Sequence, residues 1–396
     1  MSAGEAAEAM AAGWRAGRPA DELVLLPLSD GGPGFVSCLL SGFGVRSEGR
    51  AGDRSEGRAG DRSEGPADDE DEVVGVPGVE DPLGRPTSGT LALRDGTAYV
   101  ESAQACGLHL LTEADRDPGR TTTYGVGQLI RGAVEAGARR VVVGLGGSGT
   151  NDGGAGMLAA LGLAGLDAAG RLLTPGGLAL TGAATLSHRH PLVRRDGALR
   201  LVGPAAEPVE LVAATDVDAP LLGPTGAAVV FGPQKGASPG QVVALDAALA
   251  NWADVLAGHL GLDVRDLPGA GAAGGLGFAL LALGARRVPG LDVVAEEVGL
   301  DTAVAAADLV VTGEGSFDAS SLHGKVVSGV AARAMAAGVP CVALAGQVSV
   351  GRREAAAAGI EASYSLAEAV GLERALADPV GSLVTVAARV AREWSR

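Results

Sequence analysis

At 396 residues, the chain is long enough for about two domains with substantial hydrophobic cores. Its 47 acidic and 31 basic residues give a net charge of -16, which argues against nucleic acid as a main partner because phosphate binding needs clustered Lys and Arg. Three widely spaced cysteines fit neither a disulfide framework nor a zinc site. A signal peptide and a membrane span are not predicted, so we expect a cytoplasmic protein with neither a membrane nor a nucleic-acid partner.

The first elements are a helix and a strand that leads into a glycine turn. Residues 1–17 have the pattern of an amphipathic helix, and the apolar run Leu23–Leu28 predicts a strand. The turn that follows, SDGGPG, contains one carboxylate, Asp30, which either caps the turn or contacts a ligand. Helical character resumes over Phe35–Leu40.

An octapeptide repeat follows this start. RSEGRAGD occurs twice from Arg46, and RSEGPADD and an acidic run come next. Charge, glycine and the lack of apolar periodicity predict a disordered insertion, to which we assign no catalytic role. Structure is expected to resume near Val73, with a hairpin formed by Leu91–Leu93 and Thr97–Val100. Glu101 follows its second strand, where the carboxylate either faces a cleft or caps the next helix.

The stretch Val141–Ala160, VVVGLGGSGTNDGGAGMLAA, combines a β-branched strand, a glycine-dense turn and a helix. Glycines let the backbone turn its N–H groups toward a ligand, and a helix N-terminus adds partial positive charge, so the turn is a candidate phosphate cradle. It also contains the polar pair Asn151-Asp152. The motif GLGGSG with Asp167 downstream fits a dinucleotide site as well, although Asp167 lies in a predicted turn and a glycine-rich chain produces this motif by chance.

Two further strands are expected to lead to charged residues. Val209–Ala214 runs into TDVDAP, where Asp216 and Asp218 occupy alternate positions and can share one face. Such a pair suits Mg²⁺, which takes one or two carboxylates plus substrate phosphate oxygens, while solvated acids in a turn are the alternative. Val229–Lys235, VVFGPQK, places Lys235 after a predicted strand and a Gly-Pro turn, either as a phosphate clamp or as a solvent-facing side chain.

The segment Asp308–Val330, DLVVTGEGSFDASSLHGKVVSGV, is a third candidate site. We expect the strand Leu309–Thr312 to end just before several titratable residues and a helix over Val326–Ala337 to follow them. In open α/β sheets, ligand sites form at the carboxyl ends of strands. The glycine-rich run Gly269–Leu283 repeats the turn-and-helix design, for close packing or for ligand contact. The titratable candidates are Glu314, Asp318, His323 and Lys325.

These motifs together resemble the type I glycerate kinases. The matching segments, in the order of the family, are LPLSDGGPGF, ESAQACGLHLL, GLGGSGTNDGGAGMLAALG, ATDVDAPLLGPTGAAVVFGPQKGA, GAAGGLGFAL and DLVVTGEGSFDASSLHGKVVSGVA. The resemblance implies phosphorylation of D-glycerate to phosphoglycerate with ATP and Mg²⁺, by an α/β enzyme of two domains. Residues 1–45 and 287–396 would form a discontinuous flavodoxin-like, Rossmann-like parallel-sheet domain. Residues 46–85 would be the disordered repeat insertion, and residues 86–286 a second mixed α/β domain.

Phosphoryl transfer depends on positioning and on charge neutralisation, and this divides the candidate residues by role. Asp216 and Asp218 would hold Mg²⁺, and Lys325 would stabilise charge on the transferred group. Either Asp318 or Asp152 would orient the glycerate hydroxyl and accept its proton. The glycerate carboxylate needs a cation or N–H donors, which Lys325, His323 or the glycine turn 271–277 could supply. Substrate and phosphate contacts are assigned to Asp30, Glu101, Gly146, Gly147, Ser148, Asn151, Lys235 and Glu314.

The start of the chain keeps alternatives open. The family normally begins with a strand and a short loop of the type APDSFKGSL, whereas this sequence starts at the helix MSAGEAAEAM. A catalytically impaired homologue that binds ligand only is therefore one alternative to the kinase, and a dinucleotide-dependent oxidoreductase is another. The sequence leaves open whether the product is 2- or 3-phosphoglycerate and whether the protein forms a homodimer.

Overall fold

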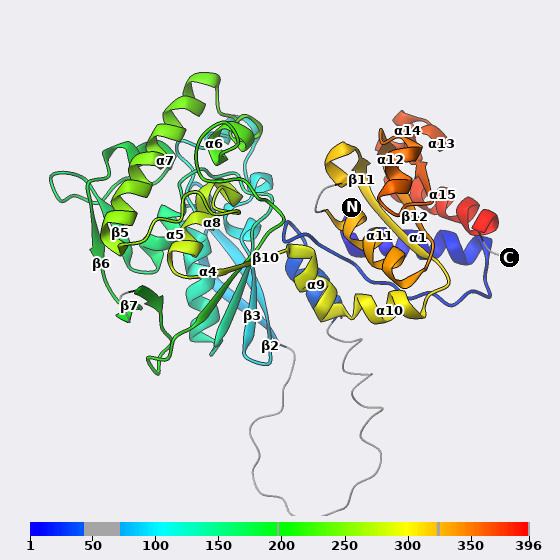
Figure 1. Ribbon diagram of the computed structural model, residues 1–396, viewed down its shortest axis with the longest axis horizontal. Coiled ribbons are helices and arrows are strands. Elements are labelled where there is room, and N and C mark those ends of the chain that lie inside the picture. The colour runs from blue at the N-terminus through cyan, green and yellow to red at the C-terminus, as the bar shows by residue number, and fades with distance from the viewer. Residues whose placement is uncertain (43–71, 196–197, 323–324, 395–396) are drawn as a thin grey trace, which may run out of the picture. The chain divides into compact units, whose positions relative to one another are not determined.

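The computed structural model describes residues 1–42, 72–195, 198–322 and 325–394 (Figure 1). The chain forms two compact units, each described here by itself. Where described, unit 1 comprises Met1–Asp30, Ser37–Gly60 and Leu291–Arg396, and unit 2 comprises Gly31–Val36 and Asp61–Gly290. Among the described helices, none combines the length and the apolar character that a membrane-spanning segment needs.

Unit 1 is built on a parallel sheet of three strands, in the order β11-β12-β13. Parallel neighbours need crossover connections, which α11 and α12 provide between successive strands. The strands are β11 (Val310–Phe317), β12 (Cys341–Val348) and β13 (Ala362–Ser365), and the helices are α1 (Ala3–Gly17), α9 (Gly290–Val298), α10 (Leu300–Ala306), α11 (Val326–Ala337), α12 (Arg352–Ala357), α13 (Leu366–Val370), α14 (Leu372–Ala377) and α15 (Pro379–Trp394).

The first and last of these helices, α1 and α15, pack side by side (Figure 1). Glycine permits the close approach, because a Cβ atom on Gly13 would clash with the carbonyl oxygen of Val384. The predicted amphipathic helix is confirmed: Trp14 lies on its buried side, and a capping box between Ser2 and Glu5 starts it. Both ends of the sequence therefore contribute to one core, and unit 1 is discontinuous in the chain.

The strand predicted over Leu23–Leu28 is wrong, because these residues belong to no strand of the structure. A strand requires a ladder of hydrogen bonds, and the ladders found among the described residues of unit 1 join β11 to β12 and β12 to β13. Pro27 also lacks the N–H group that a ladder uses. The apolar run is nevertheless partly buried, since Leu23 packs against the core of unit 1.

Unit 2 contains a six-stranded mixed sheet in the order β1-β2-β3-β4-β9-β10. The first three strands are antiparallel, which confirms the predicted hairpin, and the last four of the order are parallel to one another. The strands of this sheet are β1 (Glu72–Glu80), β2 (Pro86–Arg94), β3 (Thr97–Glu101), β4 (Arg140–Gly144), β9 (Glu210–Ala214) and β10 (Arg286–Val288). Two small hairpins lie outside it, formed by β5 (Leu163–Leu166) with β6 (Thr185–His188) and β7 (Leu192–Arg195) with β8 (Ala198–Leu201).

Helices pack around this sheet (Figure 1). The chain is therefore an α/β protein with one discontinuous parallel-sheet unit and one mixed unit, as predicted. A helix over residues 35–42 confirms the prediction for Phe35–Leu40. The α-helices of unit 2 are α3 (Ala103–Cys106), α4 (Tyr124–Glu135), α5 (Ala155–Ala160), α6 (Ala227–Phe231), α7 (Pro239–Leu260) and α8 (Ala272–Ala282).

The octapeptide repeat, which starts at Arg46, lies outside the described residues. The disorder predicted for it therefore concerns a part of the chain that the structure does not describe. Strand β1 begins at Glu72, next to the restart expected at Val73. The insertion boundary expected at residue 85 is therefore wrong, because residues 72–80 pair with β2 in an antiparallel ladder.

The strand predicted before Lys235 is also wrong, because Ala227–Phe231 forms the short helix α6. Val229 and Val230, the β-branched residues that suggested a strand, are exposed, whereas Ala227 and Ala228 are buried. Burial of the two alanines thus outweighs the strand preference of the two valines. Lys235 then closes a single 3-10 turn, Pro233–Lys235.

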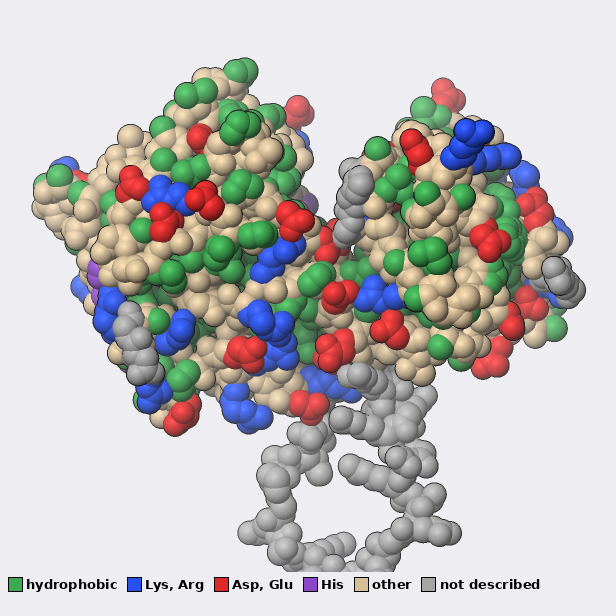
Figure 2. Space-filling view, in the orientation of Figure 1, with side chains coloured by type: hydrophobic (Ala, Val, Ile, Leu, Met, Phe, Trp, Pro, Cys, Tyr) green, Lys and Arg blue, Asp and Glu red, His purple; other side chains and the backbone are tan. Residues whose placement is uncertain are grey.

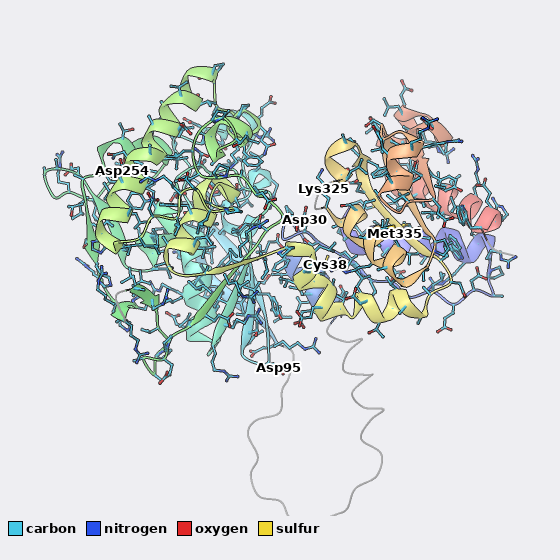
Figure 3. The ribbon with its side chains drawn as sticks, viewed as in Figure 1. Asp30, Cys38, Asp95, Asp254, Lys325 and Met335 are labelled. Atoms are coloured by element: carbon cyan, nitrogen blue, oxygen red, sulfur yellow. The ribbon has the colours of Figure 1, made fainter. Side chains whose placement is uncertain are left out.

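Acidic and basic side chains are mixed over the face of the molecule drawn in Figure 2. Arg265, for example, pairs with both Asp254 and Asp263 at 2.7 and 2.8 Å. Asp254 itself is 70% exposed on α7 and is labelled in Figure 3. Pairs of this kind contribute little to stability, because water screens them.

Candidate active site

The ends of the four parallel strands of unit 2 form one row across the sheet. Glu101 at the end of β3 pairs with Gly144 of β4, Gly144 pairs with Ala214 of β9, and Ala214 pairs with Val288 of β10. Glu101 itself ends β3, and the segments that follow Gly144 and Ala214 contain the glycine loop and Asp216. Sequence-predicted candidates from three distant stretches therefore come together at one edge, where ligands of α/β sheets bind.

The DGG turn packs onto this edge. A Cβ atom on Gly31 would meet the carbonyl oxygen of Ala214 at 2.8 Å, and one on Gly144 would meet the carbonyl oxygen of Gly31 at 2.6 Å. A Cβ on Gly146 would clash with Gly32. Glycine is needed at these positions because backbone approaches backbone, so part of the glycine signal in the sequence reflects packing.

Glu101 caps the helix over residues 35–42. Its Oε2 accepts hydrogen bonds from the N–H groups of Gly34, at 3.1 Å, and Val36, at 3.3 Å. Burial raises the pKa of this carboxyl above its ordinary value, and the backbone donors oppose that rise. Glu101 therefore caps a helix, but it caps the helix over residues 35–42 and not α3, which follows it in the chain.

The glycine loop, residues 144–156, contains a short run of backbone N–H groups without acceptors. Within the part of the chain that the structure describes, no acceptor is found for the amides of Gly146, Gly147 and Ser148. Gly147 has φ +68°, a left-handed conformation that favours glycine. Successive N–H groups around a left-handed residue form a concave surface that binds anions.

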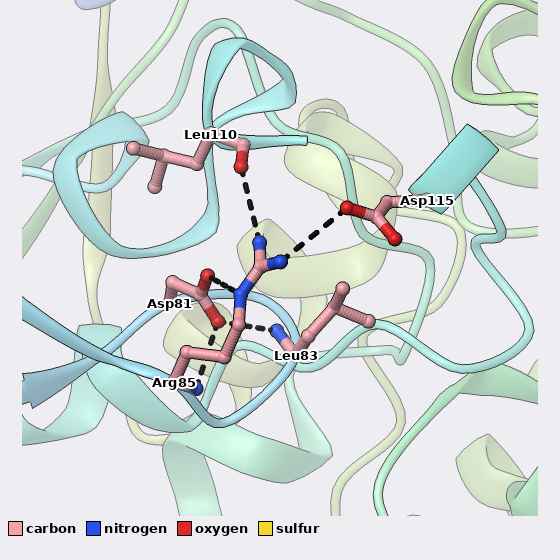
Figure 4. Close-up of polar contacts among 5 residues, drawn as sticks. All are labelled: Asp81, Leu83, Arg85, Leu110 and Asp115. Carbon is pink, nitrogen blue, oxygen red and sulfur yellow. Dashed lines mark hydrogen bonds and ion pairs between the residues drawn. The ribbon is translucent and has the colours of Figure 1, made fainter. Parts of the chain in front are cut away.

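Neighbouring segments hold the loop on both sides of this run. Gly149 donates its N–H to the carbonyl oxygen of Cys106, and its own carbonyl oxygen accepts a hydrogen bond from Thr121 Oγ1 at 2.9 Å. The segment after Cys106 packs on Gly149 and is anchored in turn by Arg85, which bonds Asp81, Asp115 and the carbonyl oxygen of Leu110 (Figure 4). The loop is therefore positioned before any ligand arrives.

Asp152 is buried and fully engaged with the backbone around it. Its carboxylate accepts hydrogen bonds from the N–H of Thr123 at 2.8 Å and from the N–H groups of Gly154 and Gly156 at 3.1 Å. The hydroxyls of Thr122 and Thr123 donate as well. Burial raises the pKa of Asp152, and these donors oppose the rise. The carboxylate thus ties the loop to the start of α4.

Lys235 is buried against the glycine loop at Ser148 and Thr150. Its ammonium group donates to Ser148 Oγ at 2.9 Å and to the carbonyl oxygen of Thr150 at 2.7 Å, and the residue is only 2% exposed. Burial lowers the pKa of Lys235 to about 8, and the nearby Cys106 and Asp152 oppose that shift. Lys235 is therefore neither a solvent-facing lysine nor, in this structure, an exposed phosphate clamp.

The side chain of Asn151 differs from those of its neighbours. The residue is fully buried, and neither its Nδ2 nor its Oδ1 has a hydrogen-bond partner among the described residues. Burying an amide without partners costs free energy, which a bound group with both a donor and an acceptor would recover.

A kink in α8 completes the surroundings of the loop. Ala273, Gly274 and Gly275 have positive φ angles inside this helix, and Gly274 accepts a hydrogen bond from the N–H of Gly153 at 3.0 Å. A Cβ on Gly274 would clash with the carbonyl oxygen of Thr150. These contacts are the close packing that is one of the two interpretations of Gly269–Leu283.

The two carboxylates after β9 have different surroundings. Asp218 is exposed and forms an ion pair with Arg287 at 2.6 Å. Asp216 is half-buried, with its Oδ2 atom inside the protein. No cluster of three or more His, Cys, Asp or Glu side chains arranged for a metal is found in the described residues.

Unit 1 carries the second group of candidates. Glu314 lies within β11 and not beyond its end, so the predicted strand Leu309–Thr312 is too short, whereas the helix Val326–Ala337 is confirmed. Burial raises the pKa of Glu314, and Lys325, Asp318 and Asp30 all act on it electrostatically. Asp30 and Lys325, labelled in Figure 3, therefore belong to one charged group with Glu314 and Asp318. His323 lies outside the described residues.

Sequence reasoning missed several partners that hold these groups. Thr122 and Thr123 bind Asp152, Ser102 donates to the carbonyl oxygen of Gly144 at 2.7 Å, and Arg287 pairs with Asp218. Only the threonines had a signal in the sequence, because the run TTTYG lies directly before α4 (Tyr124–Glu135).

Comparison with known proteins identifies the chain's relatives. The glycerate kinase family model matches residues 1–61 and 70–395. A glycerate kinase from Bacillus subtilis is 41% identical over 92% of this chain and 87% of its own length, and a glycerate 2-kinase from Escherichia coli is 36% identical over 94% and 88%. A crystal structure titled "putative glycerate kinase 2", from Salmonella typhimurium LT2, has a TM-score of 0.74 and 35% identity, covering 99% of this chain and 94% of that one.

Proposed function

Because the chain belongs to the glycerate kinase family, we propose that it phosphorylates D-glycerate to phosphoglycerate with ATP. The observation that carries this proposal in the structure is the glycine loop at the carboxyl end of β4, whose amides at Gly146, Gly147 and Ser148 have no acceptor among the described residues. Such a loop suits the phosphates of ATP, since phosphoryl transfer needs positioned donors more than covalent chemistry.

The phosphate-binding group of unit 2 has an exposed and a buried part. Gly147 is exposed, so the loop can meet a ligand there, whereas Lys235 supplies positive charge from beneath. The amide of Asn151 offers one donor and one acceptor, which matches a hydroxyl group better than a phosphate oxygen that only accepts. Glu101 contributes by fixing the helix beside the DGG turn.

We assign Mg²⁺ to Asp216 and Asp218, which would hold the ion directly or through water. The residues fit this ion in kind, because Mg²⁺ takes one or two carboxylates and completes its shell with phosphate oxygens and water, so a cluster of three protein ligands is not required. Arg287 holds Asp218 at 2.6 Å, which favours the indirect role for that residue. When bound, the ion would neutralise phosphate charge.

The catalytic roles in unit 1 go to Asp318 and Lys325. Asp318 is preferred over Asp152 as the group that orients the glycerate hydroxyl and accepts its proton, because the Asp152 carboxylate is occupied by backbone donors. Lys325 would stabilise charge on the transferred group, and Lys325, His323 or the glycine turn 271–277 would bind the glycerate carboxylate. Asp30 and Glu314 complete the substrate-binding group, and Glu314 has its pKa raised by burial.

The test is turnover by the purified protein. ATP- and D-glycerate-dependent release of ADP is expected, and the D216N variant should lose it by about 10³-fold while its circular dichroism stays unchanged. Phosphorus NMR of the product distinguishes 2- from 3-phosphoglycerate. Glycerate binding without turnover would favour the impaired, ligand-binding homologue, and binding of a nicotinamide cofactor would favour the oxidoreductase.

Three broader assignments belong to the same proposal. The two compact units would be the two domains, with residues 1–45 and 287–396 in the flavodoxin-like one and residues 72–286 in the other, because β1 pairs with β2. The protein would act in the cytoplasm without a nucleic-acid or membrane partner. Sedimentation analysis would show whether it is a homodimer.

A further inference from the structure

We propose that Lys235 is a positioning residue that acts through Ser148: its ammonium group orients the serine hydroxyl toward phosphate without touching the ligand itself. This inference rests on the proposed function, since it takes the glycine loop as the phosphate site. It departs from the sequence-based expectation, in which Lys235 contacts phosphate directly.

The geometry around the ammonium group carries the inference. Two of its three N–H bonds are used within the protein, one on Ser148 Oγ at 2.9 Å and one on the carbonyl oxygen of Thr150 at 2.7 Å. The residue is 2% exposed and ranks among the largest fully buried side chains of the described chain. A ligand on the exposed side of the loop therefore meets the loop before it meets Lys235.

The bond to Ser148 sets the direction of the serine proton. A serine hydroxyl has one proton and two lone pairs, and the ammonium group occupies a lone pair because it can only donate. The proton must then point away from Lys235. Ser148 also carries one of the three loop amides that have no acceptor among the described residues. Its hydroxyl and amide can therefore donate to the same anion.

The charged surroundings explain how a buried ammonium group is tolerated. Cys106 of α3 and Asp152 of the loop are the titratable groups that act on it, and both favour its charged form. Burial raises the pKa of the Cys106 thiol to about 12, so the thiol stays neutral and Asp152 supplies the compensating charge. The same pair of charges fixes the loop at Ser148 and Thr150 on one side and at Gly154 and Gly156 on the other.

A double-mutant cycle distinguishes action through Ser148 from direct contact. The variants are K235M, S148A and the double variant, and the quantity is kcat/KM for ATP. Each single variant is expected to lose about 10- to 100-fold, the cost of one anion donor, mainly in kcat/KM for ATP and not for glycerate. If Lys235 acts through Ser148, the double variant loses no more than about three-fold beyond K235M. Losses that multiply would overturn the proposal, and so would wild-type kinetics in K235M.

The pH dependence of kcat/KM and the activity of a conservative variant add two measurements that would not change if Lys235 had only a structural role. The kcat/KM of the wild type should fall above pH of about 8, as Lys235 loses its proton, and this limb should be absent in K235M. K235Q keeps amide donors for Ser148 and should recover part of the loss. It also replaces K235M if that variant does not fold, as judged by thermal unfolding. A wild-type limb that persists in K235M and K235Q contradicts the assignment.

Hydrogen exchange tests the loop independently of turnover. In K235M the amide of Gly149, which bonds the carbonyl oxygen of Cys106, should exchange at least about ten-fold faster, while amides of α7 stay unchanged. Unchanged exchange at Gly149 would overturn the positioning role even in an active enzyme. If the wild type does not turn over glycerate, the proposed function fails on that assay alone, and exchange still decides what Lys235 does to the loop.

Discussion

The candidate residues of unit 2 and those of unit 1 differ in the burial and the hydrogen bonding of their charged groups. In unit 2, Asp152 and Lys235 are 1% and 2% exposed, and the hydrogen bonds of their charged groups go to the loop and to the threonines before α4. In unit 1, Glu314, Asp318 and Lys325 are only partly buried. Buried, fully bonded charges fix a backbone, whereas partly buried charges can still exchange protons and ligands.

The physical reason for the difference is the cost of desolvation. An ion that leaves water must recover several kcal/mol from hydrogen bonds and opposite charge, so a fully buried ion persists only where its partners are held rigidly. Asp152 meets that condition with N–H donors from three residues. The unit 1 group meets it only in part, since Glu314 Oε1 is buried without a hydrogen bond among the described residues.

The largest expected effect is on stability, when the buried carboxylate is removed. D152A leaves the N–H groups of Thr123, Gly154 and Gly156 without their acceptor, and we expect the free energy of unfolding to fall by about 3–5 kcal/mol. Urea unfolding monitored by circular dichroism measures this change.

Asp167 provides the matched control, because it also accepts backbone N–H bonds, from Ala169 and Arg171, but in an exposed turn. D167A should lower the free energy of unfolding far less than D152A does, because water can replace the hydrogen bonds of this turn. Equal losses in D152A and D167A would remove the distinction between the buried and the exposed carboxylates.

The second effect concerns rate and belongs to unit 1. K325M removes a partly buried ammonium group that acts on Glu314, and kcat should fall by about 10²-fold, or ~3 kcal/mol in the activation free energy. The free energy of unfolding should change by less than about 1 kcal/mol, because the side chain is not fully buried. Steady-state kinetics and urea unfolding of one preparation measure both.

R333M is the control on the same helix, since Arg333 lies on α11 and pairs with Asp292 at 2.6 Å and Asp301 at 2.9 Å. It should leave kcat within about two-fold of the wild type. If K325M instead loses stability as D152A does, Lys325 stabilises the fold as Asp152 does, and its catalytic assignment fails.

A third effect, on stability, tests how tightly the kink of α8 packs against the glycine loop. G274A places a Cβ against the carbonyl oxygen of Thr150 at a position with φ +70°, and we expect a loss of about 2 kcal/mol or more in the free energy of unfolding. G258A is the matched control in α7, where a Cβ meets nothing within 4 Å, and it should stabilise by about 0.5–1 kcal/mol. A neutral G274A would show that the kink leaves room beside the loop.

Much of the fold follows from local pattern, and the roles of the loop residues do not. The hairpin, the strand before the glycine loop and the helix Val326–Ala337 were predictable because each has a periodicity or a turn signal of its own. Val229 and Val230 misled because their strand preference was outweighed by burial of the alanines beside them. The threonines that bind Asp152 and the partners of Lys235 lie 29 to 87 positions away in the chain, so tertiary packing, which no local pattern records, decides that these charges are buried.

The smallest effect is a pH dependence in which stability rises while kcat/KM falls. Burial lowers the pKa of folded Lys235 to about 8 from 10.5, so between these values the unfolded chain binds more protons than the folded one. Stability then rises with pH in this window, since the slope follows the excess of protons bound by the unfolded state. Relative to K235M, the wild type should gain about 2 kcal/mol in free energy of unfolding between pH 8 and 10.

The gain in stability would accompany the loss of kcat/KM over the same range, because the charge that positions Ser148 is the one that is costly to bury. Parallel urea titrations of wild type and K235M at three pH values measure the difference, and the ionisation of Cys106 and other groups largely cancels between the two proteins. A wild-type advantage that shrinks as pH rises would mean that the ammonium group is stabilised by its surroundings. Lys235 would then be a buried ammonium group whose partners fully compensate its loss of water, and the contrast between a buried charge that is costly to keep in unit 2 and the partly buried charges of unit 1 would disappear.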